Sequence, residues 1–296
     1  MFYIFVINGR SDKRSIQSDI KRQTQNKDMA YDVYITTGSG DATRFVNLYC
    51  DLNPKKEVCF IACGGAGTTT EVAAGIIGRG NKHLAILALA GSNDLIKTFP
   101  GRDFSTVDGI LQGECTRIDA LKVNDYYAIN VISVGMDAMA AHYANVYNES
   151  GHSHSYDKGI LKAIMLNRIN RIRVVADGEV LNKRILLLAA FGNGQFYGSK
   201  FRCTPFAVPD DGLMDICIMN TITLAGIGYA FNKYQEGTHL SGKWPLSRIF
   251  KFKRAKHVEL HSDRLIHINL DGEIIAARNV SIDVIEKSVN LILPKQ

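Results

Sequence analysis

A run of small residues in the first half of the chain has the composition of a phosphate-binding loop. It covers residues 63–68, Cys-Gly-Gly-Ala-Gly-Thr, between an apolar run at 58–62 and a helix-like stretch at 69–77. Glycines have no Cβ atom, so they can adopt positive φ and let backbone N–H groups approach an anion closely. The N-terminus of the following helix adds partial positive charge. A phosphate group is therefore the ligand predicted for the loop glycines Gly64, Gly65 and Gly67.

The loop differs from the two best-known nucleotide motifs. No Gly-Lys-Ser/Thr follows it, as a Walker A loop requires, and its spacing does not match Gly-x-Gly-x-x-Gly. Thr68 and Glu71 are three residues apart, the spacing of a helix capping box. Capping of the helix and contact with a ligand are both open interpretations of this pair.

Acidic turns are the other candidates for chemistry. Asn93-Asp94 follows the apolar run 83–89, although an Asn-Asp pair in a loop is most often only a turn. The tripeptide Asp-Gly-Glu occurs twice, at 177–179 and at 271–273, each time between strand-like runs. Asp-Gly accepts positive φ and predicts a hairpin turn at both places. The residues themselves do not distinguish the two copies.

The first hundred residues alternate short apolar runs with helix-like stretches, a pattern typical of a parallel sheet flanked by helices. Open parallel sheets bind ligands beyond the carboxyl ends of their strands. The loops after Ile7, Ala62 and Leu89 are therefore the expected binding region. The runs and stretches are 2–7, 15–25, 31–36, 41–52, 58–62, 69–78 and 83–89.

From about residue 126 strand-like runs follow one another, which predicts a mainly β second half and an antiparallel sandwich. We expect a nucleotide-binding α/β domain at 1–124 and a β-rich domain at 125–286. The last strand, about 287–296, is expected to return to the first domain. The strand-like runs are 126–134, 171–176, 183–191, 214–219, 257–261, 267–270 and 280–285.

Bulk properties fit a soluble two-domain protein. The chain has 296 residues, 46% hydrophobic and 22% charged, and no apolar run approaches the roughly 20 residues of a spanning helix. The net charge of +6 favours anionic partners, although a solvated basic surface explains it equally well. Six cysteines without a Cys-x-x-Cys pair favour a reducing compartment. We expect a cytoplasmic protein, with peripheral membrane contact left open.

The order of the motifs resembles the diacylglycerol kinase catalytic superfamily, which includes bacterial diacylglycerol kinases and sphingosine kinases. The glycine loop is similar to its Gly-Gly-Asp-Gly-Thr-x-x-Glu-Val motif, with Ala66 at the position of the aspartate. Asn8 is similar to the family's Asn-Pro opening, and Thr37 with Asp41 to its Thr and Asp-Ala segment. Residues 89–94 are similar to Leu-Gly-Thr-Gly-Asn-Asp. NAD kinases share only the glycine loop.

The second half carries longer matches. Residues 130–138 resemble Asn-x-x-x-x-Gly-Phe-Asp-Ala, and 192–198 resemble Asn-Gly-x-x-Tyr-Gly-Gly. Residues 205–215 and 270–273 are similar to Pro-x-Ala-x-x-x-Asp-Gly-Leu-Leu-Asp and to Asp-Gly-Glu. The resemblance implies an α/β N-terminal domain with a parallel sheet of the NAD kinase/diacylglycerol kinase type. It also implies a β-rich antiparallel sandwich as the C-terminal domain.

The resemblance also implies a mechanism, in which ATP and Mg²⁺ serve a lipid kinase and the lipid lies in the cleft between the domains. Glu273, aided by Asp271, would take the proton of the acceptor hydroxyl. Metal donors would be Asp94, with Asp137 as a further acidic group, and, at a separate structural site, Asp211 with the carbonyls of Val208 and Leu213. The implied nucleotide-site residues are Asn8, Thr37, Gly64, Gly65, Gly67, Thr68, Glu71, Asn93 and Asp94.

Two other functions stay open. Ala66, and Ser199-Lys200 where the family continues with glycines, motivate a catalytically impaired nucleotide- and lipid-binding regulatory protein. A kinase of a non-lipid acceptor is the third interpretation. The segment 243–256 mixes cations with aromatic residues and predicts contact with an anionic membrane, or else a solvated basic strand edge. No nucleic-acid partner is expected, and a homodimer is left open.

Overall fold

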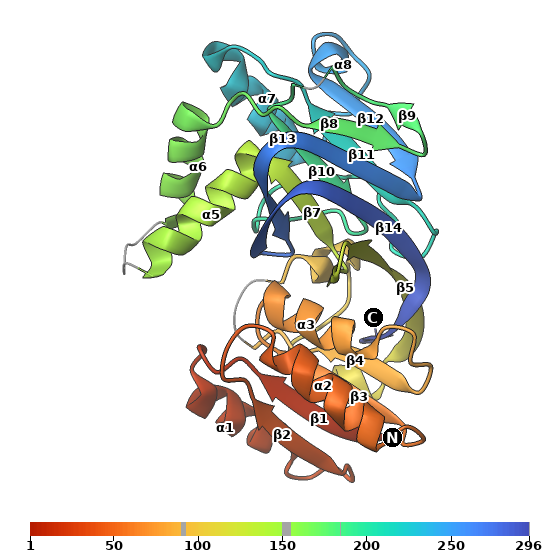
Figure 1. Cartoon of the computed structure of the whole chain (residues 1–296). Helices are drawn as coiled ribbons and strands as arrows, with labels where there is room; N and C mark the ends of the chain where they lie inside the picture. The colour runs from red at the N-terminus through yellow and green to blue at the C-terminus, as the bar shows by residue number, and fades with distance from the viewer. Residues whose placement is uncertain (90–92, 150–154, 184, 296) are drawn as a thin grey trace. The chain divides into compact units, whose positions relative to one another are not determined.

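The computed structural model shows two compact units, drawn along the chain in Figure 1. Unit 1 comprises Met1–Ala120 and Ile285–Gln296, and unit 2 comprises Leu121–Val284. Two strands, β5 (Glu114–Val123) and β14 (Glu273–Leu293), run from one unit into the other. The structure describes residues 1–89, 93–149, 155–183 and 185–295.

Unit 1 is built on a parallel sheet with the strand order β2-β1-β3-β4-β14. The strand β3 is buried along its whole length, as expected where helices cover both faces of a parallel sheet. Besides β5 and β14, unit 1 contains β1 (Phe2–Ile7), α1 (Lys13–Thr24), β2 (Tyr31–Ile35), α2 (Asp41–Leu52), β3 (Val58–Cys63), α3 (Ala66–Ile76), β4 (Lys82–Ile86), a 3-10 helix (Leu95–Thr98) and α4 (Val107–Leu111).

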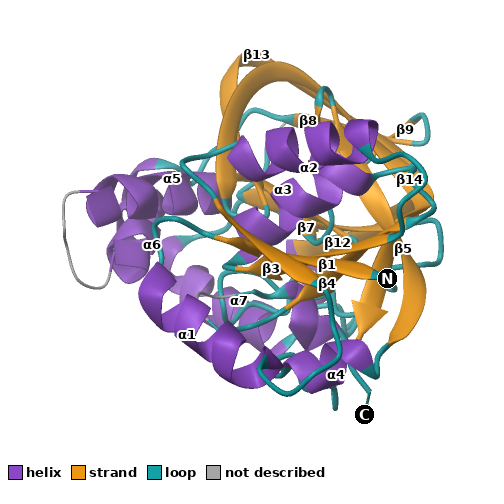
Figure 2. Cartoon of the chain, turned by 90° about the horizontal axis from the view of Figure 1, so that it is seen from below, coloured by secondary structure: helices purple, strands orange, loops and turns teal. Residues whose placement is uncertain are grey.

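The two faces of this sheet are covered by different helices. Ile16 and Ile20 of α1 and Ile110 of α4 share one apolar cluster with alternate residues of β1 and β3. The helices α2 and α3 lie together over the other face (Figure 2). They pack so closely that a Cβ atom on Gly75 would be 2.6 Å from Val46 Cγ1. This packing holds the C-terminal half of α3 against α2.

Unit 2 is an antiparallel structure with the main strand order β12-β11-β10-β7-β13-β14, and β8 pairs with β13 while β9 pairs with β8. Its elements besides β5 and β14 are β6 (Tyr126–Ala128), β7 (Val131–Gly135), α5 (Met136–Glu149), α6 (Ser155–Leu166), β8 (Arg173–Ala176), β9 (Glu179–Val180), β10 (Leu188–Gly192), β11 (Met214–Met219), α7 (Leu224–Glu236), α8 (Leu246–Ile249), β12 (Phe250–Ala255) and β13 (His257–Leu270).

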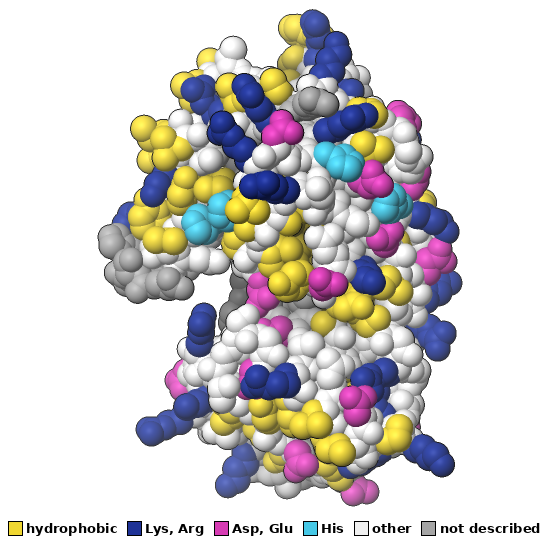
Figure 3. Space-filling model, in the orientation of Figure 1, with side chains coloured by type: hydrophobic (Ala, Val, Ile, Leu, Met, Phe, Trp, Pro, Cys, Tyr) yellow, Lys and Arg dark blue, Asp and Glu magenta, His cyan; other side chains and the backbone are white. Residues whose placement is uncertain are grey.

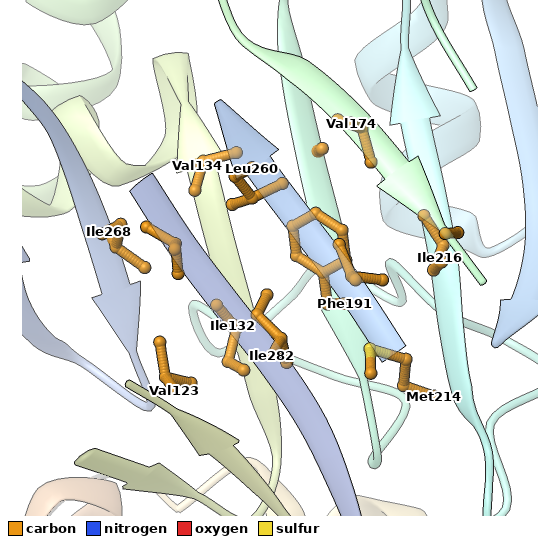
Figure 4. Close-up of a cluster of buried hydrophobic side chains, with 14 of the residues drawn as sticks. Val123, Ile132, Val134, Val174, Phe191, Met214, Ile216, Leu260, Ile268 and Ile282 are labelled. Carbon is orange, nitrogen blue, oxygen red and sulfur yellow. The ribbon is translucent and has the colours of Figure 1, made fainter. Parts of the chain in front are cut away.

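The core of unit 2 lies between layers of strands, as the predicted sandwich requires. Phe191 of β10 lies near its centre, and Leu260 and Ile282 of β13 and β14 belong to the same cluster (Figure 4). A second apolar cluster joins the other face of β10 and β11 to α5, α6 and α7. These helices were not predicted from the strand-rich pattern, and Ala140, Ala163 and Ala230 are among their buried contacts in this cluster.

Both predicted Asp-Gly hairpins are confirmed. Asp177 and Gly178 join β8 to β9 with φ values of 47° and 81°. Asp271 and Gly272 join β13 to β14 with φ values of 51° and 104°. Positive φ at both central residues is the conformation that tight hairpins favour and that the Asp-Gly sequence accepts.

Candidate functional site

In unit 1 the loops at the carboxyl ends of the strands are tied to one another. Asn8, after β1, lies against the glycine loop, because a Cβ atom on Gly64 would be 3.1 Å from Asn8 Cβ. The next residue, Gly9, donates its N–H to Thr36 Oγ1 at 3.1 Å, which joins the loop after β1 to the loop after β2. The predicted binding region is thus one connected structure.

The glycine loop leads directly into α3, whose first residue is Ala66 and whose N-terminal cap is Gly65. The first N–H groups of a helix have no acceptor within the helix, so this end of α3 presents donors and partial positive charge. Thr68 is buried in the first turn, and Gly65, Ala66 and Gly67 are half-buried. An anion placed at this end would meet the predicted set of backbone donors.

The reason for glycine at position 64 is space rather than conformation. None of Gly64, Gly65 and Gly67 has a positive φ, so the predicted left-handed backbone does not occur at this loop. A Cβ atom on Gly64 would be 2.6 Å from Thr68 Oγ1, closer than real Cβ atoms approach. Any larger residue at position 64 must therefore displace Thr68.

The loop after β4 is fixed to the first turn of α3. Asn93 donates its side-chain N–H to Thr69 Oγ1 at 2.8 Å, and its Oδ1 accepts from Leu95 N at 3.2 Å. Asp94 is nearly buried, and Lys97 Nζ lies 2.6 Å from Asp94 Oδ1. The predicted pair at 93–94 is therefore next to the glycine loop, while residues 90–92 of the same motif lie outside the described residues.

Glu71 does not form the predicted capping box with Thr68, since Gly65 caps α3 without a side-chain bond. The Glu71 carboxylate instead accepts from two backbone N–H groups at the start of α2, from Gly40 at 2.8 Å and from Ala42 at 3.0 Å. Both oxygens thus hold α2 against α3, so we do not propose a nucleotide contact for Glu71. The sequence spacing alone could not show that Glu71 caps α2 rather than its own helix, α3.

The predicted pair Thr37 and Asp41 is joined in the loop after β2. Asp41 Oδ2 accepts from the N–H of Thr37 at 2.7 Å and from its hydroxyl at 2.9 Å. Tyr34 and Arg44 also donate to this carboxylate. Chiefly the Thr37 N–H, opposed by burial and aided by the other donors, lowers the pKa of Asp41 to about 2. The carboxylate thus holds the loop in place.

Asp41→Asn is expected to lower the free energy of unfolding of unit 1 by about 2 kcal/mol at pH 7. The folded-state pKa is depressed, so the contribution of Asp41 is complete above its unfolded pKa near 4. It is lost as the pH falls through about 2. Urea unfolding from pH 7 to pH 2 should show the two proteins converging at low pH, whereas Asp51→Asn, at an exposed carboxylate of the same helix, should change little. A pH-independent gap would contradict this assignment.

In unit 2 the residue Asp271 holds the hairpin that carries Glu273. Asp271 is 7% exposed. Its Oδ2 accepts from Ile129 N at 2.8 Å and Asn130 N at 3.3 Å, and its Oδ1 accepts from Val131 N at 2.7 Å. Three backbone donors therefore occupy the carboxylate. We assign Asp271 a positioning role and not the predicted share in proton transfer.

Glu273 is the first residue of β14, opposite Leu270 in the β13 register, and its side chain is half-buried. The motif at 192–198 reaches the same place, since Asn193 Nδ2 donates to Ile129 O at 2.9 Å. Asn130 Nδ2 donates to Phe196 O at 3.0 Å, while its buried Oδ1 meets no donor within the described chain. Three motifs of the second half thus converge beside Glu273.

The second Asp-Gly-Glu copy has a different environment. Asp177 is exposed and accepts from His257 N at 3.0 Å, and Glu179 forms an ion pair with Lys253. Among the described residues, neither side chain forms a hydrogen bond or an ion pair with the motifs at 130–138 or 192–198. The place of each hairpin in the sheet therefore distinguishes the two Asp-Gly-Glu copies, and it favours the same copy as the order of the motifs does.

Asp137 is buried inside unit 2 and accepts a hydrogen bond from the Ser133 hydroxyl. Burial raises the pKa of Asp137 to about 6, although Ser133 and Tyr197 oppose the rise. The hydrogen bond from Ser133 gives this buried carboxylate a partner inside unit 2, whereas the glycine loop and Asp94 belong to unit 1. We therefore do not propose Asp137 as the metal-supporting group that the sequence suggested.

The predicted structural metal turn contains an arginine that the sequence argument missed. Asp211 Oδ1 accepts from Leu213 N at 3.0 Å, and Asp211 N donates to Val208 O at 3.4 Å. Arg254 lies 3.7 Å from Asp211 Oδ2 and 2.9 Å from Asp215 Oδ1. The Asp211 Oδ1 and Val208 carbonyl oxygens already accept from backbone N–H groups, and Arg254 lies beside the other Asp211 oxygen, so the turn does not offer Mg²⁺ the predicted set of oxygen ligands. We assign no metal to this turn.

Arg254 could have been noticed only as one of several cations in the basic segment 243–256, because nothing in its spacing indicates an acidic partner. The other residues of that segment differ in their exposure to solvent. Trp244 is 77% exposed, while Phe250 is buried in the core. Lys251 donates to Leu181 O at 2.9 Å, as expected of a strand at the sheet edge.

In the described residues no helix has both the length and the apolar character needed to span a bilayer.

Comparison with known proteins agrees with this architecture. The family model of the diacylglycerol kinase catalytic domain matches residues 3–123. The model of the YegS C-terminal NAD kinase beta sandwich-like domain matches residues 130–293. Fold and loops together define a two-domain protein of the NAD kinase/diacylglycerol kinase type. More narrowly, the chain belongs to the diacylglycerol kinase catalytic-domain superfamily, with a YegS-type C-terminal domain over more than half of its length.

Individual relatives carry the same name. A diacylglycerol kinase of Staphylococcus saprophyticus is 29% identical over 245 residues, which cover 81% of this chain and 77% of the relative. One of Staphylococcus carnosus is 25% identical with the same coverage. The crystal structure of a diacylglycerol kinase from Bacillus anthracis is 17% identical and has a TM-score of 0.70, and the match covers 99% of this chain and 96% of that one. A second, of a candidate diacylglycerol kinase, is 20% identical with a TM-score of 0.76. These structures support the fold.

Proposed function

We propose that this protein transfers the γ-phosphoryl group of ATP to a hydroxyl of diacylglycerol or a related lipid, with Mg²⁺ as cofactor. The observation that carries the proposal is the connected set of loops in unit 1. Asn8, Gly64, Thr68 and Asn93 surround or reach the N-terminus of α3, where backbone donors favour phosphate. Family membership supplies the reaction class.

Each residue has a defined part in the proposal. The N–H groups of Gly65, Ala66 and Gly67 bind phosphate oxygens, and Asn93 holds the loop in position through Thr69. Glu273, held by the Asp271 hairpin, accepts the proton of the attacking hydroxyl. Phosphoryl transfer needs little more than positioning and charge neutralisation, so these parts suffice.

Mg²⁺ fits the proposal at Asp94. Its carboxylate is nearly buried beside the glycine loop, and oxygen is the ligand type that Mg²⁺ prefers. When bound there, Mg²⁺ would neutralise phosphate charge. Lys97 already pairs with Asp94, so the carboxylate would be shared between Lys97 and the metal.

ADP release in mixed micelles tests the function directly. With ATP and Mg²⁺, micelles containing diacylglycerol should stimulate ADP release, while micelles of detergent alone should not. ATP binding without lipid-stimulated ADP release would favour the impaired regulatory protein. ADP release stimulated by a polar alcohol or a nucleoside, but not by lipid, would favour a non-lipid acceptor.

Two departures from the family motifs, Ala66 and Ser199-Lys200, motivate the alternative of a catalytically impaired regulatory protein. They do not support it equally. Ser199 adopts the left-handed conformation, with φ of 65°, directly after Gly198 at 58°. Ser199 therefore has the backbone conformation that a glycine would favour. The next residue, Lys200, forms an ion pair with Asp157 at 3.6 Å. Ala66, in contrast, lies at the first position of α3 among the proposed phosphate donors. The alternative thus depends on Ala66.

Ala66→Asp is expected to lower the Mg²⁺ concentration for half-maximal rate several-fold and to raise turnover, because it restores a carboxylate beside the phosphates. Aspartate in the first turn also suits the helix dipole, so stability should change little. Mg²⁺ titrations of the initial rate check this. Ala66→Asn is the matched control, with similar volume and no charge. Equal Mg²⁺ dependence in all three proteins would remove position 66 from metal organisation.

A further inference from the structure

Unit 2 contains a pocket of about 430 Å³ whose lining includes none of the motif residues discussed above. Three of its lining residues are neighbours across adjacent strands. His261 of β13 lies opposite Arg173 of β8 on one side and opposite Asn279 of β14 on the other. The complete lining is Arg171, Arg173, Lys183, Ile185, His261, Ser262, Asp263 and Asn279.

Strand periodicity places this pocket on the solvent face of the sheet. The preceding pair, Leu260 and Val174, belongs to the buried core, so His261 and Arg173 point to the opposite face. The β13–β14 register shifts between His261 and Ile266, and this irregularity contributes Ser262 and Asp263 to the lining. The bulge therefore forms one side of the pocket.

The charges of the lining side chains are unbalanced, although Glu259, just outside the lining, pairs with His261 at 3.0 Å. Arg171, Arg173 and Lys183 contribute three cations, and Asp263 is the acidic residue of the lining. These three cations have no ion pair with any described residue, whereas Lys253 and Lys233 pair with Glu179 and Glu236. In Figure 3 several dark blue side chains gather over the part of unit 2 where Figure 1 draws β8 and β13. An anion would relieve this repulsion.

The chemistry of the cations indicates the kind of anion. Guanidinium groups bind phosphate oxygens through paired hydrogen bonds, and an ammonium adds a point charge. Arg173 is half-buried, so its interaction with an anion is less screened by solvent than that of a fully exposed side chain. Asn279 and Ser262 can complete the hydrogen bonds to the remaining oxygens.

We propose that this pocket binds a phosphate group, either of a small phosphorylated molecule or of a lipid headgroup. The pocket is separate from the hairpin that carries Glu273. Asn279 lies six positions further along β14, which corresponds to about 20 Å of strand. The proposal is independent of the kinase reaction, since none of its residues takes part in the proposed transfer.

Calorimetric titration with inorganic phosphate tests the pocket. Arg173→Ala should weaken phosphate binding at this site at least about tenfold, and Asp263→Asn should strengthen it several-fold. Arg278→Ala removes the same charge from an exposed position of β14 that does not line the pocket, and it should bind like wild type. Arg173→Lys keeps the charge and should retain an intermediate affinity.

Vesicle sedimentation separates the two sources of the phosphate group. Binding to phosphatidic acid vesicles that Arg173→Ala weakens, beyond any binding to phosphatidylcholine, would identify a lipid headgroup. Vesicle binding unchanged by Arg173→Ala, with loss of inorganic phosphate binding, would identify a soluble phosphorylated ligand. Equal phosphate affinity in wild type, Arg173→Ala and Asp263→Asn would overturn the proposal, provided that thermal unfolding shows all three folded.

Discussion

Glu273→Gln is expected to lower the rate of phosphoryl transfer by about 10²–10⁴-fold while nucleotide affinity stays nearly unchanged. The amide has almost the same size and keeps the half-buried position at the start of β14, but it cannot accept the proton of the acceptor hydroxyl. Measuring ADP release together with equilibrium ATP binding separates the two effects. A fall in both would indicate misfolding rather than loss of a base.

The chain supplies a matched control for this variant. Glu179 follows the other Asp-Gly turn, is exposed and pairs with Lys253 of β12. Glu179→Gln should therefore retain turnover close to wild type, with at most a small change in stability. Should Glu273→Gln also turn over at a near-wild-type rate, the proposed base would be wrong.

Asp271→Ala is expected to lower the free energy of unfolding of unit 2 by about 3 kcal/mol or more. It leaves the N–H groups of Ile129, Asn130 and Val131 without their acceptor, and each stranded buried donor costs about 1–3 kcal/mol before water or relaxation compensates. Urea unfolding followed by a probe in unit 2, with limited proteolysis as a second measurement, checks this.

Asp177→Ala is the corresponding control, because Asp177 has the same place in the other hairpin. Its carboxylate also accepts from backbone N–H groups, those of Lys256 and His257, but it is exposed to water. Water can replace the lost acceptor there, so the expected loss is about 1 kcal/mol. Equal losses in the two variants would show that the three buried donors near Asp271 find other partners.

The sequence predicted the fold through patterns that do not depend on distant contacts. Alternating apolar runs predicted the parallel sheet of unit 1, and the Asp-Gly pairs predicted both hairpins. The helices α5 and α7 were missed because their buried faces are made largely of alanines and single aromatics such as Tyr234. Such faces have weak helical periodicity within a strand-rich half.

The site was predicted unevenly. Motif order located Asn8, Asn93 and the glycine loop, which the structure brings together. The partners of individual side chains could not be predicted, since Glu71 caps a helix thirty positions earlier in the chain and Arg254 reaches Asp211 from another strand. Those contacts depend on tertiary packing, which local spacing does not encode.

The strand β14 has a consequence for how the protein is made. Its beginning pairs with β13 in unit 2, and Asn290–Ile292 pair with β4 in unit 1. During translation β4 therefore emerges with one edge unpaired, and its partner follows roughly 200 residues later, on the order of 10–40 s at ordinary elongation rates. Throughout that interval the nascent sheet exposes the backbone donors and acceptors of Lys82–Ile86. The first unit to leave the ribosome is thus completed only after the second has been synthesised.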